Sequence, residues 1–343
     1  MLTGNHTEGK LAGGMVARDV PRVVHRIVEV EGVRVFYRET GGQVAPPMLL
    51  LHGFPSASHQ FRRLLDALGT RYRLIAPDYP GFGYSDAPAS ATVGGPFTYT
   101  FDRIADIIEG FCERLALDQF VLFVFDFGAP VGFRLATRHP EWIAGLVVQN
   151  GNAYDEGLSP MARQLVDCRP EVPGAEDLVR EVLTLPVTRG QYLDGATDPE
   201  TIAPDGWTLD RYFMDLPGRK QIQLDLAFDY HTNLAHYPQW QGWLRRHQPP
   251  TLIVWGRNDA FFLEAGAHAY LRDLPAAKLH LFDTGHFALE EKLPEVASLI
   301  AAFLDRTLGD CRQHAQEGPG PQIGLQRVGH PIPLTLCNDK RLQ

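Results

Sequence analysis

The fold of this chain is decided by Val121–Pro130, which reads VLFVFDFGAP. An apolar, β-prone run ends there on a single carboxylate, and a glycine and a helical pattern follow at once. This order predicts a strand, a tight turn and a helix, with Asp126 pushed out of the sheet edge at the turn. An aspartate is already ionised near neutral pH, so it can displace a leaving group from saturated carbon without an activating base.

The chain on both sides of this stretch alternates between strand-like and helix-like segments. Apolar residues at helical spacing separate the strand-like runs, as they do between Ile104 and Leu115. This alternation predicts an α/β fold with a mostly parallel sheet covered by helices on both faces. Eight strands are expected, at Val23–Val30, Val33–Arg38, Pro47–Leu51, Tyr72–Ala76, Val121–Phe125, Ile143–Val148, Leu252–Trp255 and Leu279–Phe282.

The alternation breaks between residues 151 and 248, where tryptophan, tyrosine, proline and glycine accumulate around helix-like pieces. The strand pattern then resumes and completes the same sheet, which favours an inserted helical lid over a separate domain. We therefore expect a core of residues 21–150 and 249–309 and a lid, or cap, of residues 151–248. Residues 1–20 and 310–343 lack sustained periodicity and are expected to be disordered, and Met15 is an alternative start.

Composition narrows the possible partners and location. The 343 residues are 44% hydrophobic and 21% charged, which suits an ordinary globular protein with a large core. The net charge of -9 is spread along the chain, so neither nucleic acid nor a membrane surface is expected as a partner. No signal peptide or membrane span is recognisable, and a cytoplasmic location is expected. Free thiols without metal-ligand spacing are expected at Cys112, Cys168, Cys311 and Cys337.

Four short motifs carry a family resemblance. They are His52-Gly53-Phe54-Pro55, Asp126-Phe127-Gly128, Gly256-Arg257-Asn258-Asp259 and Gly285-His286-Phe287. Nucleophile, acid and histidine in this order, each just after a strand, resemble the α/β-hydrolase superfamily, specifically its Asp-nucleophile branch of epoxide hydrolases and dehalogenases. The resemblance covers about Val23 to Leu308. It implies an enzyme with the α/β-hydrolase fold that uses no cofactor and no metal.

The resemblance implies a catalytic role for three side chains. Asp126 attacks carbon and becomes an alkyl ester, and His286 activates the water that cleaves this ester. Asp259 is expected to orient His286, while Asp283 and Asp155 are the competing acids. The structural alternative for Asp126 is a helix cap, which is a common use of aspartate before a helix.

Cleavage of the ester places an oxyanion on the carboxyl group of Asp126, and this oxyanion needs two hydrogen-bond donors. The resemblance implies the backbone N–H groups of Phe54 and Phe127 as this pair. Gly53 allows the backbone to approach closely, and the bond from Phe54 to Pro55 resembles the cis-proline turn of the family.

An epoxide leaves as an alkoxide, and lid tyrosines supply its proton in epoxide hydrolases. The segment Ala227–Asn233 is similar to the lid segment that carries one of them, so Tyr230 is the leading proton donor. An interfacial tyrosine under the lid is the structural alternative. Tyr154, near the entrance to the lid, is the best candidate for the second tyrosine, with Tyr192 and Tyr212 behind it.

A halide would need different donors. Haloalkane dehalogenases bind the departing halide with nitrogen donors, commonly a tryptophan after the nucleophile and a tryptophan or asparagine elsewhere, but this chain has Phe127 and Phe54. The lid tryptophans Trp207, Trp240 and Trp243 are candidates for substrate binding, although lid packing is the favoured interpretation of all three.

These observations favour an epoxide hydrolase acting on a small to medium apolar epoxide, ahead of a haloalkane dehalogenase. A haloacetate dehalogenase is disfavoured because Phe127 and Pro130 occupy the region of its substrate-clamping arginines. A non-catalytic ligand-binding relative is disfavoured because Asp126, Asp259 and His286 are all retained. The expected partners are a small apolar substrate and water, and the sequence leaves monomer and homodimer open.

Overall fold

A computed structural model describes residues 20–316 of the chain. The strands are β1 (Val23–Val30), β2 (Val33–Thr40), β3 (Val44–Leu51), β4 (Tyr72–Pro77), β5 (Phe120–Phe125), β6 (Ile143–Gln149), β7 (Thr251–Gly256) and β8 (Lys278–Phe282). The helices are α1 (Arg62–Leu68), α2 (Phe101–Arg114), α3 (Gly128–Arg138), α4 (Pro160–Val166), α5 (Ala175–Val182), α6 (Leu185–Leu193), α7 (Asp205–Met214), α8 (Arg219–Asp229), α9 (His231–His247), α10 (Glu264–Asp273), α11 (Ala288–Glu291) and α12 (Leu293–Gln316).

The strands form one eight-stranded sheet in the order β1-β2-β4-β3-β5-β6-β7-β8. Strand β2 runs antiparallel to β1 and β4, and the other neighbouring pairs are parallel. The mostly parallel eight-stranded sheet predicted from the sequence is therefore confirmed. Because β3, β5, β7 and β8 run in the same direction, the loops that follow them meet at one edge of the sheet, where ligands bind in such folds.

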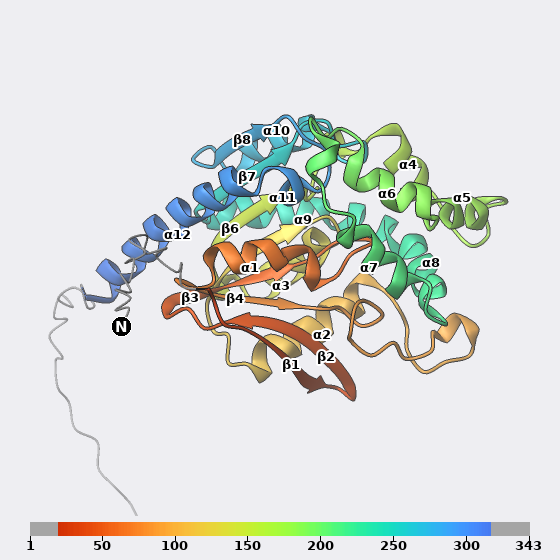
Figure 1. The fold of residues 1–343 in the computed structure, drawn as a ribbon, viewed down its shortest axis with the longest axis horizontal. Helices are drawn as coiled ribbons and strands as arrows, with labels where there is room; N and C mark the ends of the chain where they lie inside the picture. Colours follow the sequence, from red (N-terminus) through yellow and green to blue (C-terminus); the bar gives the residue numbers. More distant parts are fainter. Residues whose placement is uncertain (1–19, 317–343) are drawn as a thin grey trace, which may run out of the picture.

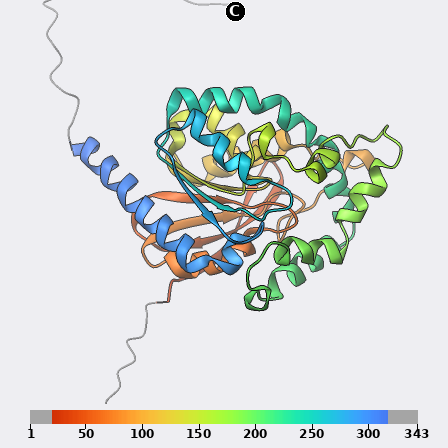
Figure 2. The ribbon, with the colours of Figure 1, turned by 90° about the horizontal axis from the view of Figure 1, so that it is seen from above.

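Each central strand contributes to two apolar cores. Leu49 and Leu51 of β3 belong to the core that includes side chains of α2, α3, α9 and α10. Met48 and Leu50 of the same strand belong to the core that includes side chains of α1 and α12. Successive side chains of a strand point to opposite faces, so a strand covered on both faces is apolar throughout, as β5 is. Figures 1 and 2 show the sheet between these helices.

The lid is inserted between β6 and β7. Helices α4 to α8 lie beyond the end of the sheet, at the right of Figures 1 and 2. The last helix of the insertion, α9, instead packs on the core: Phe133 of α3 lies 5.5 Å from Trp240 and 6.5 Å from Trp243, measured between ring centroids. Helix α8 ends at Asp229 and α9 begins at His231, so the helix that packs on α3 starts directly after Tyr230.

The ends of the chain differ from expectation at one boundary. Helix α12 continues to Gln316, so the helical part of the core passes the predicted limit at residue 309. The extension of residues 1–19 with Met15, the tail from 317 to 343, and the side chains of Cys311 and Cys337 lie outside the described residues. Cys112 and Cys168 are buried free thiols. Over residues 20–316, no helix has the length and apolarity needed to cross a membrane.

Candidate active site

Asp126 lies in the tight turn between β5 and α3. Its φ of +48° falls in the left-handed region, which a residue with a side chain rarely adopts and which marks strained functional positions. Two residues later, a Cβ on Gly128 would lie 2.2 Å from the carbonyl oxygen of Leu51, so only glycine fits against β3 there. The turn thus holds the carboxylate of Asp126 at the end of the sheet and beneath the lid.

Two backbone N–H groups face the carboxylate of Asp126. The N–H of Phe54 donates a hydrogen bond to Oδ1 at 2.6 Å, and the nearby backbone N–H of Phe127 also lowers the pKa of this carboxyl group. The peptide bond between Phe54 and Pro55 is cis. Burial raises the pKa of Asp126 to about 6, although His286 and the two N–H groups oppose the shift. Asp126 therefore combines a desolvated, reactive anion with donors already in place for an oxyanion.

His286 lies between Asp126 and Asp259. Its Nδ1 is 2.7 Å from Oδ2 of Asp259, and its Nε2 is 3.9 Å from Oδ2 of Asp126. Asp259 also accepts hydrogen bonds from Nδ2 of Asn150 at 2.8 Å and from the N–H of Phe261 at 2.8 Å. Burial opposes the charge on His286, but the nearby carboxylates of Asp259 and Asp126 raise the pKa of His286 overall. The arrangement suits an imidazole that removes a proton from water beside Asp126.

The competing acids do not contact His286. Asp283 accepts a hydrogen bond from Nδ2 of Asn258 at 2.8 Å on the exposed surface. Asp155 has a side chain that is 68% exposed and lies 3.7 Å from Arg163. Of the three candidate acids, only Asp259 forms a hydrogen bond with His286.

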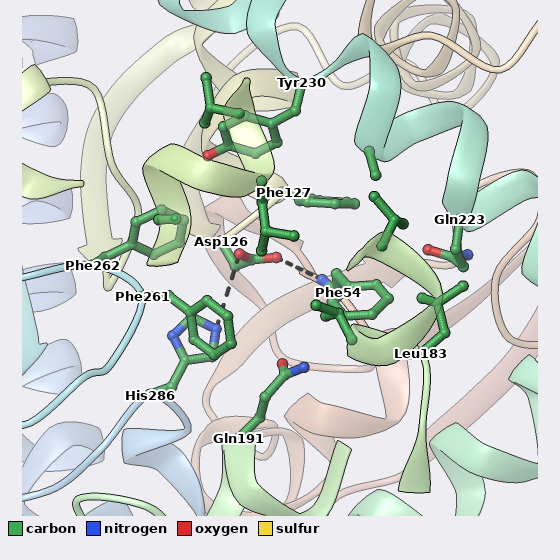
Figure 3. Close-up of a pocket in the computed structure, with 16 residues that line it drawn as sticks. Phe54, Asp126, Phe127, Leu183, Gln191, Gln223, Tyr230, Phe261, Phe262 and His286 are labelled. Atoms are coloured by element: carbon green, nitrogen blue, oxygen red, sulfur yellow. Dashed lines mark hydrogen bonds and ion pairs between the residues drawn. The ribbon is translucent and has the colours of Figure 1, made fainter. Parts of the chain in front are cut away.

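Asp126 and His286 open into a pocket beneath the helices of the insertion (Figure 3). Aromatic and aliphatic side chains form most of its wall, and its charged residues are Asp126 and His286. The lining residues are Phe54, Asp126, Phe127, Ala162, Leu165, Val166, Val179, Val182, Leu183, Gln191, Gln223, Ala227, Tyr230, Phe261, Phe262 and His286. A pocket of this kind suits an uncharged and largely apolar molecule.

Tyr230 carries the one hydroxyl group among these lining side chains. Its ring lies 5.9 Å from that of Phe127 and 5.6 Å from that of Phe101, and its hydroxyl points toward the side of the pocket that holds Asp126 (Figure 3). Burial, followed by the negative charge of nearby groups including Asp126, raises the pKa of Tyr230 well above its ordinary value. The phenol therefore stays protonated and available as a proton donor.

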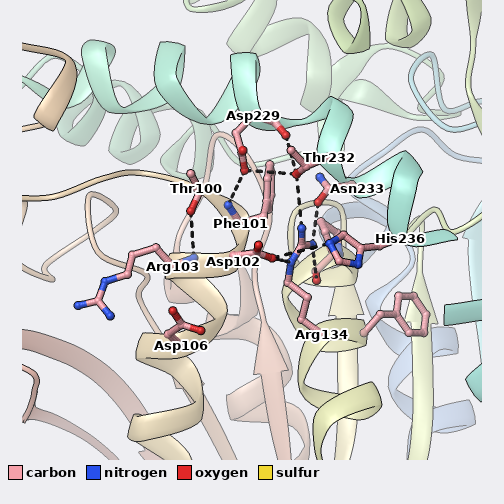
Figure 4. Close-up of polar contacts among 12 residues, drawn as sticks. Thr100, Phe101, Asp102, Arg103, Asp106, Arg134, Asp229, Thr232, Asn233 and His236 are labelled. Atoms are coloured by element: carbon pink, nitrogen blue, oxygen red, sulfur yellow. Dashed lines mark hydrogen bonds and ion pairs between the residues drawn. The ribbon is translucent and has the colours of Figure 1, made fainter. Parts of the chain in front are cut away.

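Contacts on both sides of Tyr230 hold it at the junction of α8 and α9 (Figure 4). Before it, Oδ2 of Asp229 accepts a hydrogen bond from the N–H of Phe101 at 2.7 Å. After it, Oδ1 of Asn233 accepts one from Nη1 of the buried Arg134 at 2.7 Å. The helix that follows Asp126 and the helix that begins at Phe101 thus both fix the position of Tyr230.

The structure contradicts the expectation for a second lid tyrosine. Tyr154 is fully buried away from the pocket, and its hydroxyl donates to Oδ2 of Asp273 at 2.8 Å. The hydroxyl of Tyr192 donates to Asp210 at 2.5 Å, and Tyr212 is 60% exposed. None of the three lines the pocket, so Tyr230 has no partner tyrosine there.

The expectation that three tryptophans bind substrate is also contradicted. Trp240 and Trp243 are buried in the core beside Phe133, and Trp207 packs on Tyr192 at 5.7 Å between ring centroids. None lines the pocket. These side chains pack against other side chains, in line with the packing interpretation that the sequence favoured for all three.

Sequence reasoning missed three polar residues of the site. Asn150, directly after β6, both donates to Asp259 and accepts from the N–H of Gly256 at 2.9 Å. The position of Asn150 directly after a predicted strand could have identified it as a residue of the site. Gln191 and Gln223 line the pocket from α6 and α8, and no motif surrounds them.

Comparison with known proteins places this site in a family. Residues 46–293 match the family described as the alpha/beta hydrolase fold. An uncharacterized hydrolase of Saccharomyces cerevisiae is 38% identical over 81% of this chain and 96% of its own length. A cis-3-alkyl-4-alkyloxetan-2-one decarboxylase of Shewanella oneidensis is 30% identical over 76% of this chain and 82% of its own. A haloalkane dehalogenase of Mycobacterium marinum is 30% identical over 79% of this chain and 89% of its own.

Solved structures agree on the fold. The epoxide hydrolase CorEH aligns with a TM-score of 0.66 at 18% identity, covering 83% of this chain and 99% of its own. Identity this low shows the fold alone. The family match, which covers most of the chain, and the full-length relatives carry the assignment. The chain belongs to the α/β-hydrolase fold family and is an enzyme of that family, a hydrolase.

Proposed function

We propose that this enzyme is an epoxide hydrolase that works through an ester on Asp126. The observation that carries the proposal is the position of Tyr230, whose hydroxyl is the one acidic O–H group lining a pocket that also holds a buried, reactive carboxylate. An epoxide needs both groups at once, because its carbon must be attacked while its oxygen gains a proton.

In the first step, a carboxylate oxygen of Asp126 attacks one carbon of the epoxide ring. The bond from that carbon to the ring oxygen breaks, and the oxygen takes the hydroxyl proton of Tyr230. An alkoxide is a far stronger base than a phenolate, so this transfer is favourable even with the raised pKa of Tyr230. The apolar wall excludes water and strengthens the charge interactions within the pocket.

In the second step, Nε2 of His286 takes a proton from water, and the resulting hydroxide attacks the carboxyl carbon of the ester. Negative charge forms on the carbonyl oxygen of Asp126, where the N–H groups of Phe54 and Phe127 stabilise it. Collapse of this intermediate breaks the bond between carbonyl carbon and ester oxygen, and a diol leaves. The departing alkoxide takes the proton of the carboxyl group formed on Asp126, which becomes a carboxylate again, and the proton on His286 returns through solvent to the phenolate of Tyr230.

Haloalkane dehalogenation is the second candidate because a relative that is 30% identical carries that name. The lining of the pocket favours it less, since no indole lines it and Phe127 follows the nucleophile. The two glutamine amides are its remaining side-chain N–H donors besides His286.

Turnover of a small panel tests the proposal. The purified protein is incubated with terminal epoxides and with bromoalkanes of the same chain lengths, and diol formation and bromide release are measured. We expect diol formation to exceed bromide release. Bromide release without diol formation would instead favour the dehalogenase.

A further inference from the structure

Two buried amides line the active-site pocket without any hydrogen bond to the described residues 20–316. Gln191 and Gln223 are each 5% exposed. Nε2 of Gln191 and Oε1 of Gln223 have no hydrogen-bond partner. A buried amide atom left without a partner destabilises the folded protein, so native proteins rarely keep one without a use.

Other buried atoms of this kind lie elsewhere in the protein. Nε1 of Trp240 and Nε1 of Trp243, for example, also lack partners, but neither tryptophan lines the pocket. Gln191 and Gln223 are the only amide side chains in the wall of the pocket, and they come from two different lid helices, α6 and α8. Gln223 also borders a smaller neighbouring pocket, whereas Gln191 borders only the active-site pocket among those described.

The amides lie away from the proposed proton donor. Figure 3 shows Tyr230 on one side of Asp126, Gln191 on the opposite side, and Gln223 beyond Phe54. A substrate with its ring oxygen at Tyr230 and its reacting carbon at Asp126 therefore extends its substituent toward the amides. Leu183, an apolar lining residue, lies beside Gln223.

We propose that Gln191 and Gln223, at separate places in the pocket wall, make up a polar subsite that binds a hydroxyl group on the substituent of the substrate. A hydroxyl can accept a hydrogen bond from the free N–H of Gln191 or donate one to the free C=O of Gln223. A charged group fits less well, since no lysine or arginine is among the described residues that line the pocket. The inference rests on the proposed epoxide hydrolase activity and makes its substrate a hydroxylated epoxide.

Paired substrates test the subsite. Terminal epoxides that end in a hydroxyl, on short chains of increasing length, are each compared with the epoxide in which a methyl group replaces the hydroxyl. We expect kcat/KM of the full-length wild-type enzyme to favour the hydroxyl member by about tenfold at the chain length that reaches the amides, as one buried hydrogen bond would give.

The variants Gln191→Met and Gln223→Met remove the amides at nearly constant volume. We expect each variant to reduce the preference for the hydroxyl member, and Gln164→Met, which changes an exposed lid glutamine, to retain it. A ratio near one in the wild-type enzyme at every chain length would overturn the subsite. So would an unchanged ratio in both pocket variants.

The same compounds separate this inference from the function on which it rests. Intact mass spectrometry of a His286→Gln variant reports whether each epoxide forms the ester on Asp126. If both the hydroxyl epoxide and its methyl counterpart form the adduct, but the wild-type enzyme shows no preference in kcat/KM for the hydroxyl epoxide, only the subsite is contradicted. No adduct and no turnover with either member contradicts the epoxide hydrolase itself.

Discussion

Nδ1 of His286 lies 2.7 Å from Oδ2 of Asp259, and the opposite ring nitrogen faces Asp126 at 3.9 Å. The first contact fixes the ring and stabilises its charged form. The second leaves the imidazole beside the carboxylate that we propose as the nucleophile. The predictions below follow from this geometry and from the environment of Tyr230.

The rate of attack on substrate should depend on the ionisation of Asp126. Burial raises the pKa of this carboxyl group to about 6, and only the anion attacks carbon. We expect kcat/KM for an epoxide to be level above about pH 7 and to fall about tenfold per pH unit well below 6. Rapid-quench measurement of ester formation across this range checks the prediction. A rate of ester formation that stays level down to pH 4.5 would show that the pKa of Asp126 is not raised.

The ionised Asp126 should also destabilise the folded protein. Its pKa is raised from 3.8 to about 6 on folding, so the folded state binds the proton more tightly than the unfolded state does. Protonated Asp126 therefore contributes to the stability of the folded protein in full below the unfolded-state pKa of 3.8. This contribution is lost as the pH rises through the folded-state pKa of about 6.

Asp126→Asn removes this titration and retains an oxygen for the N–H of Phe54. We expect the variant to be more stable than wild type by up to about 3 kcal/mol near pH 8, with a smaller gain near pH 5. Urea unfolding at both pH values measures the difference. A gain that is equal at both, or that increases toward low pH, would contradict the assignment.

Tyr230→Phe should separate the two candidate activities. Loss of the hydroxyl removes the proton for the epoxide oxygen, and a general acid commonly contributes about a hundredfold or more. We expect diol formation to fall by about that factor and any bromide release to change little. Tyr212→Phe, on the exposed face of the lid, is the matched control and should behave as wild type. Equal losses of both activities in Tyr230→Phe would count against the acid role.

Arg134 should matter more for stability than its surface neighbour Arg138. The Arg134 side chain is 3% exposed and bonds Asp102, Asn233 and the carbonyl oxygen of Pro130. Arg134→Leu leaves these acceptors without a donor, and we expect a loss of about 2–4 kcal/mol in urea unfolding. Arg138→Leu breaks contacts that are largely in solvent and should cost less than about 1 kcal/mol.

Diol formation should also fall in the Arg134→Leu variant, because the contact with Asn233 helps to fix the start of α9 beside Tyr230. The assay is run under conditions where unfolding curves show the variant to be folded. Full activity together with full stability would show that this network has neither role.

The sheet and the residues at its edge could be predicted from the sequence for a physical reason. A strand buried on both faces must be apolar throughout, so β5 is recognisable, and the turn that ends it is marked by Asp126 and Gly128. Asp259 and His286 follow strands in the same way, and parallel strands bring such residues to one edge whatever lies between them in sequence.

The lid could not be predicted to the same depth because no strand fixes the positions of its side chains. The prediction of Tyr154 as a second proton donor was wrong because its hydroxyl donates a hydrogen bond to Asp273, which is 119 residues away in the sequence. The packing of α9 on α3 had a signal in the sequence: Tyr237, Trp240 and Leu244 follow helical spacing and form an apolar stripe, which is typical of a helix that packs on a core.

The proposed attack by Asp126 is tested most directly by trapping the covalent ester that it forms. His286→Gln should leave attack by Asp126 intact and block cleavage of the ester, so the intermediate accumulates. The purified variant is incubated with a reactive terminal epoxide, and intact mass is measured before and after digestion into peptides. We expect a mass increase equal to one epoxide molecule, located on Asp126 and absent from the double variant with Asp126→Asn. An unmodified protein, or a modification located elsewhere, would contradict attack by Asp126.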